Sequence, residues 1–128
     1  IIVAIDVKKN PLGEYKVYSH SEKKVTDFDS IRFAVQMEAL GAGEIFLNSV
    51  DRDGTMEGYD TDLIKKVSEK LTIPLVACGG AGKIEDIGNA VRAGASAAAA
   101  GSMFIYQGKN RSVLINFPTQ GELKKVLE

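Results

Sequence analysis

Residues 75–82 read Leu-Val-Ala-Cys-Gly-Gly-Ala-Gly, and they are the clearest indication of the fold of the chain. Its first four residues form a short apolar run behind Pro74, which is typical of a strand buried inside a sheet. The glycines that follow lead into residues 84–93, where we predict a helix that ends at Gly94. The stretch therefore predicts a strand, a tight loop and a helix, which together form one unit of an α/β protein.

The same unit recurs on both sides of this stretch. Residues 1–5 are a continuous and mostly β-branched run, typical of a strand buried on both faces. Asp27 or Asp29 is expected to cap the next helix. We predict further strands over 44–50 and 95–100, a short extended piece over 15–18, and helices over 30–40, 60–71 and 120–127. The order βαβαβαβα predicts a parallel sheet with helical crossovers.

Four such units would make up half of a (βα)8 barrel. A loose repeat of roughly 25–45 residues suits either a (βα) barrel or a flavodoxin-like sheet. A complete (βα)8 TIM barrel needs about 250 residues, whereas this chain has 128 and begins at Ile1 inside an apolar run. We therefore expect residues 1–128 to form one unit, a (βα)4 half of a (βα)8 barrel cut from a longer protein.

Composition excludes several classes of function. A hydrophobic share of 45% and a charged share of 26% argue against disorder. With 16 basic and 17 acidic residues the chain has no basic excess, so we expect no nucleic-acid partner. The richest apolar stretch, residues 97–106, is too short to span a bilayer, and no signal peptide is visible. With a single cysteine, we expect a cytoplasmic protein without a membrane partner.

Polar residues follow the predicted strands, at the edge where parallel α/β sheets hold their sites. Asp6 ends the first strand, and a carboxylate there can transfer protons; alternatively it caps a turn or pairs with a neighbouring lysine. Residues 51–55, Asp-Arg-Asp-Gly-Thr, follow the second strand and combine two carboxylates, a glycine and a hydroxyl. Their alternative is a plain turn, because Asp-Gly is a common turn pair.

Two glycine-rich segments follow the third and fourth strands. Residues 79–82 lead into a helix, and bare backbone amides at a helix N-terminus can bind an anion. The alternative is a tight connection between strand and helix. Gly101-Ser102 repeats the arrangement. A (βα)8 barrel usually binds phosphate after its seventh and eighth strands, which these two strands would be if the chain holds the last four of eight.

The remaining candidates are weaker. His20 is expected to be solvated in a polar loop, and Cys78 to be a core residue because no histidine lies near it in sequence. Asn110-Arg111-Ser112 matches a glycosylation sequon, but nothing else in the sequence indicates secretion. No metal-ligand spacing is present, and we expect neither a metal nor a cofactor.

Five motifs together resemble one known family. They are Ala4-Ile5-Asp6, residues 41–45, residues 48–55, Gly58-Tyr59-Asp60 and residues 79–82. In order and spacing they are similar to the C-terminal half of the cyclase subunit of imidazole glycerol phosphate synthase, over residues 1–102. Residues 51–60 are the most specific part, because the loop of the sister isomerase in the same pathway lacks the Gly-Tyr-Asp continuation.

The resemblance implies a (βα)8 barrel and an ammonia-dependent cyclase and lyase. A partner glutaminase supplies ammonia through the barrel, and the substrate is a phosphoribulosyl-formimino aminoimidazole carboxamide ribotide. The products are imidazole glycerol phosphate, used in histidine biosynthesis, and an aminoimidazole carboxamide ribotide. Asp6 matches one of two catalytic aspartates, whose counterpart lies in the N-terminal half. The 128-residue chain alone is therefore expected to be inactive, and to associate with that half or with a second copy.

The resemblance also implies the binding residues. Glu44 matches a charged residue at the ammonia opening on the barrel floor, as an ammonia gate. The positions around the phosphate ends of the substrate correspond to Asp53, Gly54, Thr55, Gly79, Gly80, Gly101 and Ser102.

Two departures from the family pattern matter. Cys78 stands where the family usually has serine, which would weaken one hydroxyl contact. Residues 103–108 and 111–118 instead resemble paralogues from bacterial surface-polysaccharide clusters, which pass ammonia to a sugar-amidating enzyme. This leaves an alternative function, an ammonia-delivering barrel scaffold for amidation of a surface-polysaccharide sugar. A third alternative is a phosphate-binding α/β domain of unrelated use.

Overall fold

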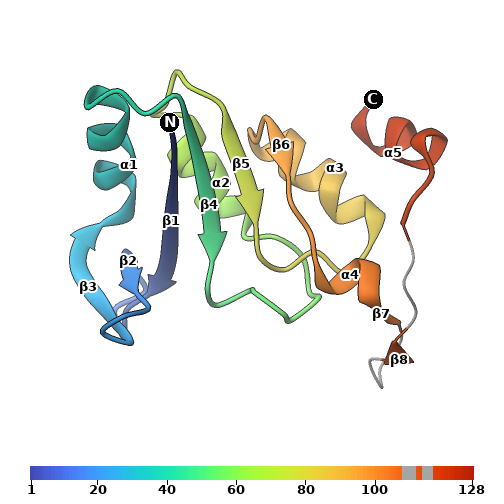
Figure 1. Cartoon of the computed structure of the whole chain (residues 1–128), viewed down its shortest axis with the longest axis horizontal. Helices are drawn as coiled ribbons and strands as arrows, with labels where there is room; N and C mark the ends of the chain where they lie inside the picture. Colours follow the sequence, from blue (N-terminus) through green and yellow to red (C-terminus); the bar gives the residue numbers. More distant parts are fainter. Residues whose placement is uncertain (108–111, 114–116) are drawn as a thin grey trace.

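A six-stranded, mostly parallel sheet forms the centre of the chain (Figure 1). The computed structural model describes residues 1–107, 112–113 and 117–128. The sheet order is β3-β2-β1-β4-β5-β6. The strands are β1 (Ile2–Lys9), β2 (Tyr15–Ser19), β3 (Lys24–Asp29), β4 (Glu44–Ser49), β5 (Leu75–Cys78) and β6 (Ala97–Ala98). The four strands β1, β4, β5 and β6 are parallel neighbours in chain order, whereas β2 and β3 pair antiparallel.

This order separates the two architectures that the sequence left open. A flavodoxin-like sheet reverses direction after its first strand, so its first strand lies between its second and third. Here each parallel strand pairs with the next one in the chain, as in a barrel wall. The α/β prediction of a partial (βα) barrel is confirmed, and the sheet is open, with β3 and β6 at its edges.

Helices connect the parallel strands, and Figure 1 shows α2 behind β4 and β5. Asp29 caps α1, because its carboxylate accepts hydrogen bonds from the amides of Ile31 and Arg32. The predicted bounds of α3 and α5 are confirmed residue by residue, and the other predicted helices differ by a few terminal residues. The helices are α1 (Ser30–Ala39), α2 (Thr61–Ser68), α3 (Ile84–Ala93), α4 (Ser102–Ile105) and α5 (Gln120–Leu127).

The strands of the parallel sheet are buried on one face only, which corrects the prediction of burial on both. The buried residues alternate along each strand: Ile5, Val7, Ile45, Leu47, Leu75 and Ala77. Together with residues of α1, α2 and α3 such as Ala34, Val67 and Ala90, they form one apolar core. The opposite face carries Asp6, Asn48 and Cys78, which stay half-buried.

Several strands differ from the predicted ones in their bounds or were not predicted. β1 does not end near Asp6 but continues to Lys9, because residues 7–9 pair with β2. β6 is only two residues long rather than six. β3, the short helix α4 and the small hairpin of β7 (Tyr106–Gln107) and β8 (Ser112–Val113) were not predicted.

Parts of two sequence interpretations lie outside the described residues. The sequon at 110–112 and the tail segments 103–108 and 111–118 include positions 108–111 and 114–116, whose structure is not described. Among the helices that are described, none combines the length and apolar character needed to cross a membrane.

Candidate functional site

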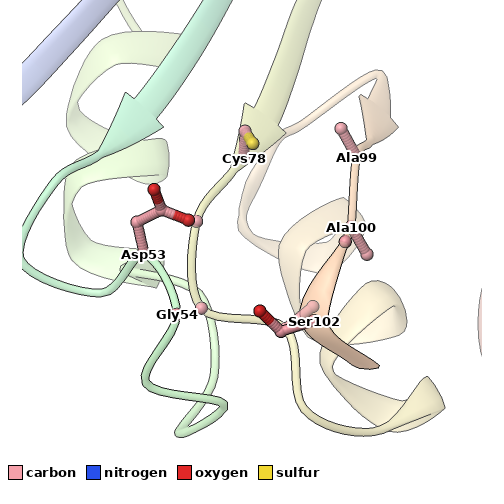
Figure 2. Close-up of a pocket in the computed structure, with 10 residues that line it drawn as sticks. Asp53, Gly54, Cys78, Ala99, Ala100 and Ser102 are labelled. Atoms are coloured by element: carbon pink, nitrogen blue, oxygen red, sulfur yellow. The ribbon is translucent and has the colours of Figure 1, made fainter. Parts of the chain in front are cut away.

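A pocket of about 270 Å³ lies where the parallel strands end (Figure 2). It is lined by Asp53, Gly54, Cys78, Gly79, Gly80, Ala81, Ala99, Ala100, Gly101 and Ser102. Three separate stretches therefore meet: the loop after β4, the glycines after β5 and the segment after β6. Six of the seven predicted phosphate-binding residues line this pocket, and Thr55 is the exception.

The glycines after β5 allow the close packing that shapes the pocket. Gly79 has φ +94°, and a Cβ there would lie 2.6 Å from the carbonyl oxygen of Ser49. Gly80 has φ +112°, and its Cβ would collide with the carbonyl of Gly58. The amide of Gly58 in turn donates a 2.7 Å hydrogen bond to the Gly80 carbonyl. Side chains are therefore excluded at both positions by backbone conformation and by space.

The loop after β4 is held by its own hydrogen bonds. The amide of Asp53 donates to the carbonyl of Ser49 at 2.9 Å. The hydroxyl of Thr55 donates to the carbonyl of Arg52 at 2.7 Å, which explains why Thr55 does not line the pocket. Asp53 itself is exposed, and Figure 2 shows its carboxyl group on the side of the pocket opposite Ala99 and Ala100.

The Gly-Tyr-Asp motif joins this loop to the rest of the chain. The Tyr59 hydroxyl donates a 2.7 Å hydrogen bond to the carbonyl of Ala99, a pocket residue. Tyr59 is buried, and this burial is the main cause that raises the pKa of its phenol well above the usual range, so it acts as a donor. Asp60 accepts a hydrogen bond from the amide of Leu63 and caps α2.

Asp6, Asn48 and Cys78 form one row across three strands beside the pocket. Asp6 pairs in register with Asn48 on β4, and Asn48 pairs with Cys78 on β5. The side-chain amide of Asn48 donates to Asp6 Oδ1 at 3.0 Å. The other carboxylate oxygen of Asp6 lies 3.2 Å from Nε2 of His20, whose side chain is 64% exposed, as the sequence predicted.

Cys78 is a pocket residue rather than a pure core residue. Burial raises the pKa of its thiol, and the nearby negative charge of Asp53 raises it further. A hydrogen bond with the Gly79 backbone opposes this effect, and Asp6 contributes a smaller increase. The thiol is therefore protonated near neutral pH, which argues against a nucleophilic role. Because Asp6 and Cys78 both pair in register with Asn48, Asp6 lies two strands from a residue that lines the pocket.

The start of α3 is less available to an anion than the sequence suggests. Asp86, which is buried, accepts hydrogen bonds from the amides of Gly82 and Lys83 at 2.9 and 3.0 Å. A carboxylate of the same helix thus occupies the position that the sequence analysis offers to a ligand. The pocket itself begins earlier in the chain, at residues 78–81.

Glu44 lies at the opposite end of the sheet. It is the first residue of β4 and pairs with Ile2 at the start of β1. The length of β4 therefore separates it from Asp53, which follows the other end of that strand. This position is compatible with a role on the barrel floor, and it excludes Glu44 from the pocket.

Sequence reasoning missed two residues of the site, His20 and Asn48. Asn48 could have been found from the register, because the parallel pairing of the first two predicted strands aligns it with Asp6. His20 required knowledge of the β2–β3 hairpin, which the sequence indicated only as a short extended piece.

Comparison with known proteins identifies the family of the chain. The family model described as "Histidine biosynthesis protein" matches residues 1–111. The chain belongs to this family. The match confirms the family that the five sequence motifs indicated, and it spans every strand of the six-stranded sheet.

Three relatives of the histidine biosynthesis family illustrate the similarity. Two are named imidazole glycerol phosphate synthase subunit HisF. The protein from Dehalococcoides mccartyi is 49% identical over 107 residues, 83% of this chain and 42% of its own length. The protein from Streptomyces griseus is 42% identical over 104 residues, 81% of this chain and 41% of its own length. A Vibrio vulnificus protein, provisionally named subunit hisF3 of the same synthase, is 43% identical over 130 residues, 100% of this chain.

The aligned segments cover all or most of this chain, but they cover only half or less of each relative. The segment similar to the Vibrio vulnificus protein is 50% of that protein's length, and the shares of the other two are smaller. The chain therefore spans about half the length of the curated relatives it matches.

Proposed function

We propose that residues 1–128 are the C-terminal half-barrel of a cyclase subunit of the imidazole glycerol phosphate synthase type. The complete protein would use ammonia to convert a phosphoribulosyl-formimino aminoimidazole carboxamide ribotide into imidazole glycerol phosphate. The observation that carries this proposal is the pocket, in which Asp53, the glycines after β5 and Ser102 meet, and whose Cys78 lies in the same sheet row as Asp6. The names of the relatives support the product, and the description of the family supports the pathway.

In this proposal Asp6 is the proton-transferring carboxylate. It is about one-third exposed and lies on the open sheet face, so a ligand in the barrel interior can reach it. A positioned carboxylate contributes roughly 10²–10⁴-fold as a general acid or base. Its counterpart would lie in the N-terminal half, and the 128-residue chain alone would be a poor catalyst for that reason.

The pocket would hold one phosphate end of the substrate. Gly54, Gly79, Gly80 and Gly101 leave this part of the wall without side chains, so a phosphate can approach the backbone closely, and the Ser102 hydroxyl offers a donor. Asp53 is negative and would repel a phosphate at contact distance, so we assign it to hydroxyl groups of the ribulose part. Thr55 would act indirectly, because its hydroxyl holds the turn at Arg52.

The proposal includes partners as well as a substrate. Glu44 would belong to the ammonia gate at the far end of β4, where a glutaminase subunit would dock. The edges of the open sheet would close against the N-terminal half-barrel or a second copy of this chain. We further propose a cytoplasmic location, as expected for such a metabolic enzyme. Light scattering tests the association, and a stable monomer of the 128-residue chain would contradict it.

The decisive experiment is an ammonia-dependent cyclase assay on the complete protein, which follows loss of the formimino ribonucleotide. We expect turnover that falls at least 100-fold in Asp6→Asn, with substrate affinity retained. Ser102→Ala is the complementary variant, since it should raise KM more than it lowers kcat. Undiminished turnover in Asp6→Asn would refute the assignment.

The same assay addresses the alternative of an ammonia-delivering scaffold for sugar amidation. A folded protein that stimulates a glutaminase but has no cyclase activity would favour that alternative. A protein that binds neither phosphate compounds nor a glutaminase would refute both.

A further inference from the structure

His20 makes a contact with Asp6 that the proposed mechanism does not yet use. The histidine lies in the turn between β2 and β3, and its Nε2 is 3.2 Å from Asp6 Oδ2. Asn48 donates to the other oxygen of the same carboxylate at 3.0 Å. The two oxygens of Asp6 therefore each face a separate nitrogen, one from a neighbouring strand and one from the hairpin.

The hairpin holds the histidine in this position through several contacts. The His20 ring packs edge-on against Tyr18, with ring centroids 4.9 Å apart. β2 pairs with residues 7–9 of β1, directly after Asp6 in the chain. The buried hydroxyl of Ser30 donates to the Tyr15 carbonyl at 3.0 Å, which ties β2 to the start of α1. His20 is therefore carried by a braced hairpin, although its own side chain is 64% exposed.

Two donors on different oxygens define the plane of a carboxylate. With a single hydrogen bond, the Asp6 carboxyl group could rotate about its Cβ–Cγ bond, because this terminal torsion is broad. With donors on both oxygens, that rotation breaks one of the two contacts. The imidazole Nε2–H suits this task because it can donate both when the ring is neutral and when it is protonated.

We propose that His20 is a positioning residue, which fixes the orientation of the Asp6 carboxylate by donating from Nε2 to Oδ2. This inference rests on the proposed catalytic function of Asp6. It adds that the β2–β3 hairpin belongs to the active site, although none of its residues lines the pocket. Charged groups near the contact are Lys8, whose Nζ lies 5.9 Å from the Tyr18 ring centroid and 3.8 Å from Asp51, and the ion pair of Glu22 in the turn with Lys24 at the start of β3.

The kinetic test compares three variants of the complete protein. Misplacing a reacting group by about 1 Å costs up to 100-fold in rate, so we expect His20→Ala to lower kcat roughly 10-fold. KM should change less than about two-fold, because Asp6 is not assigned to substrate affinity. His20→Gln, which keeps an N–H donor, should recover most of kcat. Glu22→Gln, the matched control, removes a charge from the same turn and should leave turnover unchanged.

A spectroscopic measurement tests the contact without turnover. The imidazole ¹⁵N resonances of His20 are those that disappear from the spectrum of His20→Gln. They should shift in Asp6→Asn, which removes the acceptor charge, and stay in place in Glu22→Gln. Resonances that do not respond to Asp6→Asn would overturn the inference, as would a His20→Gln enzyme as slow as His20→Ala.

Failure of this inference is distinguishable from failure of the proposed function. If Asp6→Asn abolishes turnover while His20→Ala turns over at the wild-type rate, the role of His20 is refuted and that of Asp6 stands. If turnover survives Asp6→Asn, both proposals are overturned.

Discussion

Replacing Gly80 by alanine should destabilise the chain by two separate physical effects. The first is conformational, because φ +112° is disfavoured for residues with a Cβ and costs about 1–2 kcal/mol. The second is steric, because the new Cβ would collide with the carbonyl of Gly58 and lie 3.0 Å from Cβ of Arg52. Overpacking of this kind costs about 1–3 kcal/mol. The expected total is therefore about 2–5 kcal/mol.

Gly41→Ala is the matched control, because Gly41 has φ +105° and a Cβ there would meet no atom within 4 Å. This variant should show the conformational cost alone, about 1–2 kcal/mol. Urea denaturation of the complete protein, followed by circular dichroism, measures both losses. Equal destabilisation in the two variants would refute the argument that Gly80 is required by close backbone approach.

Two further predictions concern contacts that hold the sheet to its helices. Tyr15→Phe removes the hydroxyl that donates to the buried Asp60 at 3.0 Å and to Asp62 at 3.1 Å, and should cost about 1–2 kcal/mol in urea unfolding; a loss below about 0.3 kcal/mol would contradict it. Glu38→Gln should remove a pH-dependent part of stability, because hydrogen bonds from the Thr72 hydroxyl and from backbone amides lower the pKa of Glu38 below its ordinary value of 4.5. The free energy of unfolding of the wild type should exceed that of the variant above this ordinary pKa, and the difference should disappear as pH falls through the folded-state pKa. A difference that grows in acid would contradict the prediction.

The sequence predicted the parallel part of the fold because its strands have a clear signal. β4 and β5 are apolar runs bounded by glycine or proline, and their neighbours are helices with recognisable ends. β3 lacks such a signal, since it reads Lys-Val-Thr-Asp-Phe-Asp and none of its side chains is fully buried. It is a strand because it pairs with β2, and the Thr26 hydroxyl supports the pairing by donating to the Val17 carbonyl at 2.7 Å.

The candidate site was predictable where it follows strand ends and unpredictable where it depends on a hairpin. Asp53, the glycines after β5 and Ser102 all follow strands of the parallel sheet, so their meeting at one edge follows from topology. The contact between Asp6 and His20 depends on how a turn 14 positions further along folds back. The spacing of residues along the chain does not predict this contact.

The composition of the pocket wall affects how this site can change by mutation. Four glycines and three alanines are among its ten lining residues, so these seven residues can offer only backbone polar groups to a ligand. A point mutation cannot delete a peptide group, but it can add atoms where none stand now. Substitutions at Ala99 or Ala100 would therefore alter the size of an acceptable ligand long before they alter the type of hydrogen bond offered to it. Mutations in this wall would therefore change which ligand shapes fit, while the backbone hydrogen-bonding groups stay the same.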